Sequence, residues 1–382
     1  MRSYPPGTGW DASVVLPVSL SAPFRFASTA ELVKYQESSK KGWQSEYGRI
    51  GNPTVRAVEM RLAALMGAED ALLFASGMAA VTTTMLSFLG AGDHVILTSD
   101  CYKRTRDFVS VTLGKFDVNS DILPVDVGEI EKAICRRTRL IFTESPTNPY
   151  LNVADLEMLA VLGREHGILT VVDPTFATPV NARPLSFGID LVIHSCTKYL
   201  GGHNDLIAGA VAGSLEHIEC IRELRGTVGG ICGPETAYML ERGLKTLCLR
   251  VRQQNGSALR IAEHLESHPK VRRVFYPGLK SHPHHTIARK QMSGFGGVVS
   301  FLLDADCDGT ARFVDALEIP AIAPSLGGVE SLVEQPALMG YLDMPRPERE
   351  RLGMYESLVR FAVGIEDAED LIADIDRALK RL

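Results

Sequence analysis

The most reactive group that the sequence offers is a lysine beside two hydroxyl residues. Lys198 lies in the stretch Ser195–Tyr199, directly after the apolar run Leu191–Ile193. A lysine amine that burial keeps uncharged is a nucleophile that condenses with an aldehyde to an imine, and neighbouring hydroxyl groups suit a phosphate. A lone lysine on a turn is more commonly exposed. The two glycines of Gly201–Asp205 indicate a tightly packed backbone here rather than a generic loop.

Three other short motifs lie close to expected strands. Ser76–Met78 separates a strand from a helix, where free backbone amides favour phosphate. Asp173 ends an apolar run, and Tyr47 and Arg49 precede a glycine-rich turn, where a phenol and a guanidinium suit phosphate recognition. Taken singly they are ordinary, because the same residues serve as a helix cap, a metal-binding or capping carboxylate, and a surface turn.

Taken together, these motifs predict a site for pyridoxal phosphate (PLP). This cofactor needs a phosphate cradle, a carboxylate for its pyridinium nitrogen and a lysine that forms an imine with its aldehyde. The cradle, the carboxylate and the lysine each follow an expected strand, and open α/β sheets bind ligands outside the carboxyl ends of their strands. We therefore expect PLP as an imine on Lys198, with its ring nitrogen facing Asp173.

The elements that must position these residues alternate between helix and strand. Periodicity predicts helices at 54–66 and 78–89, and short apolar runs predict strands at 71–74, 95–98, 140–142, 169–172 and 191–193. Short buried strands separated by helices indicate a mostly parallel sheet that is covered on both faces. Residues 51–245 are therefore expected to form an α/β domain that binds PLP.

The two ends of the chain differ from this middle part. Residues 1–50 contain many prolines and glycines and are expected to form an arm that contacts a neighbouring subunit. Residues 246–382 are expected to form a smaller α+β domain. It has a helix at 247–267, strands at 271–275, 297–303 and 358–363, and a last helix with an apolar stripe of Leu371, Ile375, Leu379 and Leu382.

Composition narrows the class of protein. The chain has 382 residues, 45% of them hydrophobic and 23% charged, and a net charge of −6, which favours a soluble globular protein without a nucleic-acid partner. We expect no membrane span and no signal peptide, since no apolar run of 18 residues and no basic leader occurs. Seven scattered cysteines favour reduced thiols and the cytoplasm, or a plastid if a transit peptide has been removed. His282–His285 is expected to be an exposed loop, so we expect no metal site.

At this level of detail the chain resembles the Cys/Met-metabolism PLP-dependent enzymes of fold type I, which are aspartate-aminotransferase-like. Within that family it is most similar to the plant-type cystathionine γ-synthases. The similarity extends over nearly the whole chain. The matching stretches are Glu46–Arg49, Gly51–Thr54, Ala75–Met78, Thr143–Pro149, Thr197–Tyr199, Gly201–Asp205, Gly294–Phe301, Ala323–Ser331 and Leu358–Phe361.

The resemblance implies a role for individual positions. Lys198 and Tyr102 are the implied catalytic residues, the first forming the imine and moving protons, the second stacking on the ring. The implied cofactor-binding residues are Tyr47, Arg49, Ser76, Gly77, Met78, Asp173, Thr175, Ser195, Thr197 and Lys198, of which Tyr47 and Arg49 come from the neighbouring subunit. The implied substrate-binding residues are Glu46, Tyr102, Asn148, Ser325, Glu330 and Arg360. A homotetramer built from two active dimers is also implied.

The implied reaction is γ-replacement on an activated homoserine, such as its O-phospho, O-acetyl or O-succinyl ester. The γ-substituent leaves, a vinylglycine-type imine remains, and the thiol of cysteine adds to give cystathionine, a step of transsulfuration and methionine biosynthesis. Two alternatives stay open. One is γ-elimination, as in cystathionine γ-lyases, and the other is a specialised γ-substitution of secondary metabolism with a related amino acid or another nucleophile.

Several departures from the family bear on this choice. Glu330 argues against a cystathionine β-lyase, and Arg104 stands where methionine γ-lyases have a cysteine. The basic stretch Lys103–Arg106 is typical of the plant enzymes, which use a phosphorylated homoserine, although a solvated basic loop explains it equally well. Pro174 replaces a usual Asn or Gly, and Ile231–Glu235 leaves the plant pattern, which leaves room for a specialised substrate.

Two rivals from other classes are disfavoured. A nicotinamide-dependent oxidoreductase would share the sheet but needs a GxGxxG motif after the first strand, and none is present. A catalytically silent homologue is disfavoured because Lys198, Asp173, Tyr102 and Arg360 are all intact.

Overall fold

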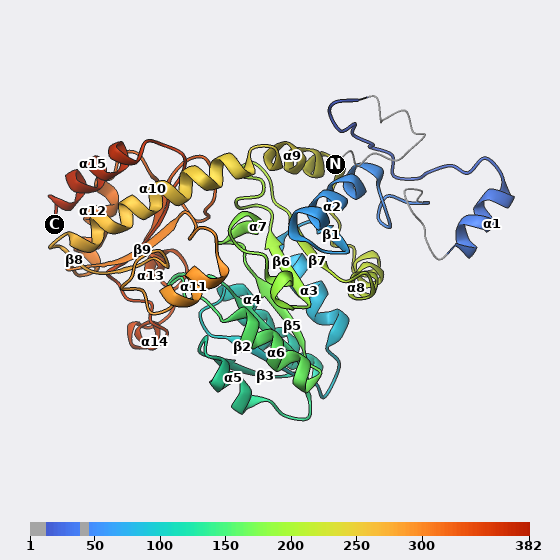
Figure 1. Ribbon diagram of the computed structural model, residues 1–382, viewed down its shortest axis with the longest axis horizontal. Coiled ribbons are helices and arrows are strands. Elements are labelled where there is room, and N and C mark those ends of the chain that lie inside the picture. Colours follow the sequence, from blue (N-terminus) through green and yellow to red (C-terminus); the bar gives the residue numbers. More distant parts are fainter. Residues whose placement is uncertain (1–12, 39–45) are drawn as a thin grey trace.

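The larger part of the molecule is built on a seven-stranded sheet (Figure 1). The computed structural model describes residues 13–38 and 46–382. The strand order is β1-β7-β6-β5-β4-β2-β3, and β7 alone runs antiparallel to its neighbours β1 and β6. The strands are β1 (Asp70–Phe74), β2 (His94–Thr98), β3 (Asn119–Leu123), β4 (Thr138–Glu144), β5 (Leu169–Asp173), β6 (Leu191–Ser195) and β7 (Gly209–Gly213).

Helices cover both faces of this sheet. Leu97 and Phe142 pack in one cluster with residues of α3 and α8, whereas their strand neighbours Ile96 and Ile141 pack with α5 and α6. Alternate residues of a strand point to opposite faces, so these apolar runs are buried from both sides. The helices are α2 (Pro53–Met66), α3 (Gly77–Phe88), α4 (Lys103–Asp107), α5 (Val127–Ala133), α6 (Leu156–His166), α7 (Thr178–Asn181), α8 (Leu215–Val228) and α9 (Pro234–Leu244).

A second, five-stranded sheet lies beside the first (Figure 1). Its strand order is β10-β11-β12-β9-β8, and its core joins residues of α10, α12 and α15. The strands are β8 (Val271–Phe275), β9 (Val298–Leu303), β10 (Ala321–Ile322), β11 (Leu332–Glu334) and β12 (Leu358–Ala362). The helices are α10 (Leu247–Ser267), α11 (His285–Gln291), α12 (Cys307–Ala316), α13 (Pro336–Met339), α14 (Arg346–Arg351) and α15 (Ala368–Leu379).

The expected elements are present, most of them within one or two residues of their predicted bounds, and the mostly parallel sheet is confirmed. No residue range was predicted for strands β3, β7, β10 and β11, nor for most of the shorter helices, among them α5, α6, α8, α9 and α12. Strand β3 has an exposed and partly exposed surface, and β7 consists of Gly, Ala and Val, so neither shows the large apolar run that marks the other strands. The boundary near residue 245 remains a proposal, because one hydrophobic cluster includes residues from both sides of it.

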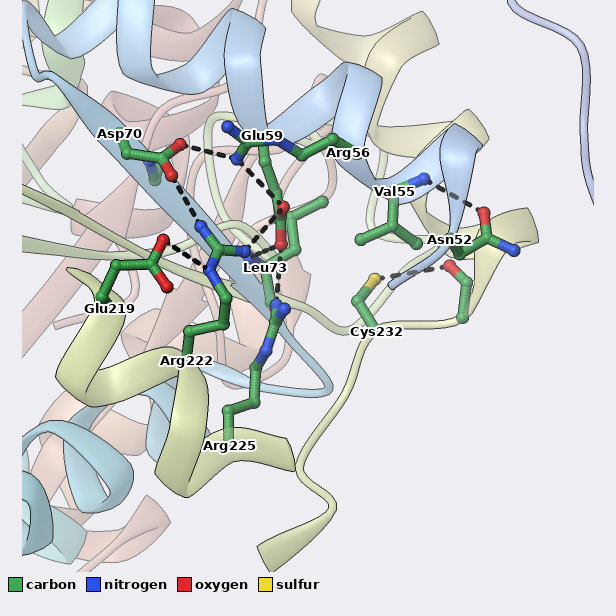
Figure 2. Close-up of polar contacts among 12 residues, drawn as sticks. Asn52, Val55, Arg56, Glu59, Asp70, Leu73, Glu219, Arg222, Arg225 and Cys232 are labelled. Carbon is green, nitrogen blue, oxygen red and sulfur yellow. Dashed lines mark hydrogen bonds and ion pairs between the residues drawn. The ribbon is translucent and has the colours of Figure 1, made fainter. Parts of the chain in front are cut away.

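A buried ionic network joins the start of the first sheet to two helices (Figure 2). Glu59 of α2 accepts from Arg225 of α8 at 2.7 Å and from the backbone N–H of Leu73 at 3.0 Å. Asp70 at the start of β1 pairs with Arg56 and Arg222, each at 2.6 Å. Because Glu59 holds the strand directly, this network fixes β1 and therefore the turn that follows it.

The N-terminal arm leaves the body of the molecule (Figure 1). Its helix α1 (Thr29–Glu37) projects away from the sheets, and Val14 and Leu20 are exposed. Residues 1–12 and 39–45 of the predicted arm lie outside the described part of the chain. Contact of this arm with another subunit remains a proposal. Within the described residues, no helix has both the length and the apolar character needed to cross a membrane.

Candidate active site

A cavity of about 880 Å³ opens at the carboxyl ends of the parallel strands. The residues that end or follow four strands meet there: Ser76 after β1, Glu144 of β4, Asp173 of β5 and Ser195 of β6. Twelve of the predicted site residues line it: Ser76, Gly77, Met78, Tyr102, Asn148, Asp173, Thr175, Ser195, Thr197, Lys198, Ser325 and Arg360. The cavity is thus the place that the sequence indicated for a ligand.

One wall of the cavity has the features of a phosphate cradle. Ser76 caps α3, its side chain accepting from the Ala79 N–H at 3.0 Å, and the first amides of any helix lack intrahelical partners. Gly77 lies so close to Ser195 that a Cβ on it would be 3.1 Å from the Ser195 Cβ. The glycine therefore lets the helix N-terminus and a hydroxyl group approach the same point in space.

Lys198 lies in the cavity as a partly desolvated amine. Its Nζ donates to Ser325 Oγ at 2.7 Å. Burial, helped by the positive charge of Arg360, lowers the pKa of Lys198 to about 8, against an opposing effect from Glu334. A larger fraction of this amine is therefore uncharged and nucleophilic near neutral pH than of an ordinary lysine.

Asp173 presents a carboxylate oxygen to the cavity. Its Oδ1 accepts from the Thr175 N–H at 2.9 Å and from the Thr175 hydroxyl, whereas Oδ2 has no hydrogen-bond partner among the described residues. Burial raises the pKa of Asp173 to about 6. A protonated ring nitrogen at Oδ2 would satisfy this oxygen and stabilise the charged carboxylate, so the pair of Lys198 and Asp173 fits PLP.

Arg360 on β12 is held by three partners. Its Nη1 donates to Asn148 Oδ1 at 3.1 Å and pairs with Glu334 at 3.0 Å, and its Nη2 donates to the Ser325 carbonyl at 2.9 Å. Its Nε is buried without a partner in the described chain. The guanidinium lines the cavity in a fixed position, which suits a carboxylate of a ligand.

Lys103 and Arg104 of the basic stretch after Tyr102 line the cavity, whereas Arg106 does not. Lys103 donates to the Gly340 carbonyl at 2.8 Å, and Arg106 donates to the Ser99 carbonyl at 2.9 Å and to the Tyr341 hydroxyl. Arg104 is 69% exposed, lines the cavity and has only a 3.6 Å ion pair with Asp107. Of the three cations, Arg104 is therefore the one best placed to meet an anionic group of a ligand.

Four predicted residues lie outside the lining of this cavity. Glu330 accepts from Asn204 at 2.7 Å, and Arg49 donates to the Gly226 carbonyl at the end of α8. Tyr47 is 46% exposed with the Arg49 guanidinium 5.6 Å from its ring centre, and Glu46 accepts from Gln36. Within one chain these residues do not meet Lys198, and their functional roles stay predictions.

Sequence reasoning assigned no role to Glu144 and Glu334. Glu144 ends β4 beside Asp173 and accepts from the Tyr102 N–H at 2.7 Å, and burial, with the charge of Asp173, raises its pKa well above the usual value. The position of Glu144 at the end of a strand could have identified it as a site residue from the sequence. The pairing of Glu334 with Arg360 depends on the register of β11 and β12, and no local pattern shows it.

The histidines of His282–His285 have structural contacts. The expectation of an exposed loop at His282–His285 is wrong, because His282 is buried near the Tyr150 carbonyl and α11 begins at His285. His284 Nδ1 accepts from the Val153 N–H at 3.2 Å, and His285 Nδ1 lies 2.9 Å from the Pro277 carbonyl. No group of three or more potential metal ligands occurs among the described residues. Cys101 and Cys196 are buried, and burial raises the pKa of both thiols.

Comparisons with known proteins agree with this geometry. The model of the family described as Cys/Met metabolism PLP-dependent enzyme matches residues 8–380. The chain is 50% identical to "Cystathionine gamma-synthase 1, chloroplastic" of Nicotiana tabacum over 96% of its own length and 68% of the relative's. It is 42% identical to "Cystathionine gamma-lyase" of Bacillus subtilis over 88% and 89%. The crystal structure of metB from Corynebacterium glutamicum matches with a TM-score of 0.92 at 38% identity, covering 99% of this chain and 95% of that one.

Proposed function

Because this chain belongs to the Cys/Met metabolism PLP-dependent enzyme family, we propose that it catalyses γ-replacement on an activated homoserine, with cysteine as the nucleophile and cystathionine as the product. Its cofactor is pyridoxal 5′-phosphate. The observation that carries the proposal is the presence of the Lys198 amine and the unpartnered Asp173 oxygen in one cavity. The relatives named cystathionine γ-synthases at 44–50% identity support the choice of reaction.

The residues of the cavity would hold the cofactor at three points. The amides of Gly77 and Met78 and the hydroxyls of Ser195 and Thr197 would bind its phosphate, and Asp173 would keep its ring nitrogen protonated. When bound, the cofactor supplies an electron sink conjugated to the substrate's Cα. Lys198 Nζ, once released, would take the proton from Cα and exchange protons at Cβ. Tyr102 would pack on the ring and close the cavity to water.

The remaining polar groups would orient the substrate. Arg360, with Asn148 and Ser325, would bind the α-carboxylate, because all three line the cavity and Arg360 contacts both partners. Arg104 would meet the γ-substituent at the mouth of the cavity, which favours a phosphate leaving group. Glu46 and Glu330 are proposed to lie on the substrate side in the assembled enzyme.

The second candidate function is γ-elimination, since relatives named cystathionine γ-lyases are 39–42% identical to this chain. Incubation with O-phosphohomoserine, with and without cysteine, separates the two. Formation of cystathionine that consumes cysteine supports γ-replacement, while 2-oxobutanoate at an equal rate with or without the thiol supports γ-elimination. If neither O-phospho- nor O-acyl-homoserine is turned over, both candidate functions are wrong, and a specialised substrate is the remaining alternative.

The leaving group is tested by a charge change at the cavity mouth. Arg104→Gln is expected to lower kcat/KM for O-phosphohomoserine by roughly tenfold to a hundredfold, the loss of one charge-assisted hydrogen bond, with much less effect on O-acetylhomoserine. The control is Lys115→Gln, which removes a positive charge from an exposed residue outside the cavity lining. Equal losses on both substrates would exclude Arg104 as a phosphate ligand.

Assembly and compartment belong to the same proposal. We propose a homotetramer of two active dimers, which light scattering of the purified protein tests by mass against 41.6 kDa for one chain. We propose the cytoplasm or a plastid as the compartment, since the seven cysteines are free and two relatives are named chloroplastic.

A further inference from the structure

A thiol, an imidazole and a carboxylate meet at the edge of the sheet opposite the cavity. Cys135 lies in the turn between α5 and β4, His94 is the first residue of β2, and Asp121 belongs to the edge strand β3. His94 Nδ1 lies 3.7 Å from Cys135 Sγ, and His94 Nε2 lies 3.3 Å from Asp121 Oδ2. Because β2 and β4 begin here and end at the cavity, the cluster is separate from the site described above.

The contacts define which nitrogen of His94 accepts a proton. Asp121 can only accept when ionised, so the neutral ring carries its hydrogen on Nε2 and leaves Nδ1 as an acceptor toward Cys135. Thr138 completes the arrangement. Its Oγ1 accepts from the Cys135 N–H at 2.9 Å, lies 2.9 Å from His94 Nδ1 and lies 3.5 Å from Cys135 Sγ. The hydroxyl donates to Nδ1 while the ring is neutral. Once Nδ1 has accepted the thiol proton it donates to Oγ1 in turn, and the hydroxyl can then donate to the sulfur and stabilise a thiolate.

A nucleophile within reach of a base, with the base oriented by a third group, is the arrangement that activates thiols. We propose that Cys135 is an activated cysteine and a modification site for low-molecular-weight disulfides, with His94 as the proton acceptor and Asp121 orienting the ring. The Cys135 thiolate attacks one sulfur of the disulfide and forms a new S–S bond. The old S–S bond breaks, and its electron pair leaves with the second sulfur as a thiolate, which takes up the proton that His94 accepted.

Access and charge at the site agree with this role. Cys135 is exposed, whereas His94 is buried with an exposed fraction of 6% and is therefore held in place. The hydrogen bonds from Thr138 and from the Arg137 backbone lower the pKa of the Cys135 thiol. The charged neighbours are Asp121 on β3 and the exposed Arg136 and Arg137 of the same turn, with Arg139 paired to Asp93 at 3.3 Å.

The chain provides its own controls. Cys220 on α8 and Cys248 on α10 are also exposed, but neither forms a hydrogen bond with an ionisable side chain among the described residues. The folded holoenzyme is treated with limiting glutathione disulfide at pH 7, and mass spectrometry of its peptides measures the mixed disulfide at each cysteine. We expect Cys135 to react roughly tenfold faster than Cys220 and Cys248. Equal rates at the three positions would overturn the proposal.

Two variants assign the activation to the cluster. His94→Gln removes the acceptor beside the sulfur and is expected to bring the rate at Cys135 down to that of the other two cysteines. Because His94 is buried, Asp121→Asn serves as a second variant on an exposed residue, and it is expected to lower the Cys135 rate severalfold while γ-replacement activity stays unchanged. If both variants fold and Cys135 still reacts at the wild-type rate in each of them, the proposal is wrong. This conclusion does not depend on which reaction the cavity catalyses.

Discussion

At Lys198, burial and two opposite charges set how readily the amine reacts. Burial and Arg360 lower its pKa to about 8, and Glu334 opposes them. An amine attacks an aldehyde only when it is uncharged, so the rate of PLP uptake by the apoprotein is expected to rise with pH and to level off above about 8. The rise of visible absorbance after mixing measures this rate. With an ordinary lysine, the rate of PLP uptake would keep rising up to about pH 10.4. A midpoint above 10, or unchanged uptake in Lys198→Ala, would contradict the assignment.

Glu144 is expected to position Tyr102 through one hydrogen bond. Burial raises its pKa, and its Oε1 accepts from the Tyr102 N–H. Glu144→Gln keeps an acceptor for that N–H and should leave kcat/KM within about threefold, whereas Glu144→Leu leaves the N–H unpaired and should lower kcat/KM about tenfold or more. If Gln lowered the rate as far as Leu does, or displaced the pH optimum, the group would be acting as a carboxylate.

At the level of elements, strand β7 shows why a small-residue strand belongs beneath the phosphate cradle. A Cβ on Gly209 would lie 2.3 Å from the Ser76 carbonyl oxygen and 2.7 Å from the Gly77 Cα. Gly209→Ala is therefore expected to displace the start of α3, to cost about 1–3 kcal/mol of stability and to weaken PLP binding about tenfold or more. Fluorescence titration of the apoprotein with PLP measures the affinity.

The matched substitution is Gly256→Ala in the middle of α10, where the added Cβ would meet no atom within 4 Å apart from the adjoining helix backbone. It should leave PLP affinity unchanged and stabilise the protein by about 0.5–1 kcal/mol, since alanine restricts the unfolded chain and favours the helix. Equal affinities in wild type and Gly209→Ala would show that the cradle does not depend on this close packing.

The network around Glu59 should make the α2–β1–α8 unit sensitive to acid. Burial alone would raise the pKa of Glu59, but the charges of the surrounding arginines, Arg225 foremost, hold it below the usual value. A carboxyl whose pKa is lowered by folding stabilises the native state above its unfolded pKa of about 4.3, and this contribution is lost as the pH falls through the folded value.

Removing the buried carboxylate should be more damaging than removing an exposed one. Glu59→Ala leaves Arg225 buried and unpaired and is expected to cost about 3–5 kcal/mol of unfolding free energy at pH 7. Glu219→Ala, whose carboxylate is 57% exposed, should cost less than about 1 kcal/mol. Urea unfolding at pH 7 and pH 4 measures the unfolding free energy of both variants and of the wild type. The difference in this free energy between Glu59→Ala and wild type should be smaller at pH 4.

At the level of the whole molecule, the sequence indicated the site better than it indicated the surroundings of the site. Asp173 ends a strand, and Ser76 and Lys198 follow strands. Because the strand ends of a parallel sheet converge, a local pattern was enough to bring these residues together. Other contacts connect residues that are far apart in the chain. Glu334 pairs with Arg360, and Lys103 contacts the Gly340 carbonyl and the Tyr341 ring. Such contacts depend on how the second sheet is placed beside the first, and no periodicity encodes that.

One expectation concerns how two chains would share a site. Tyr47 and Arg49 lie outside the cavity that holds Lys198, although the family resemblance implies that they bind the same phosphate from a neighbouring subunit.

Lys198→Ala and Arg49→Ala should each be inactive alone. In a mixed dimer, one of the two sites would receive an intact Lys198 and an intact Arg49. Because random pairing makes about half of the dimers mixed, co-expression should restore about a quarter of the wild-type activity. Lys198→Ala mixed with Asp173→Ala, whose residues line one cavity of one chain, should restore none. Differently tagged chains that co-purify as mixed dimers yet stay inactive in the first pairing would show that each chain builds its site without the partner's arginine.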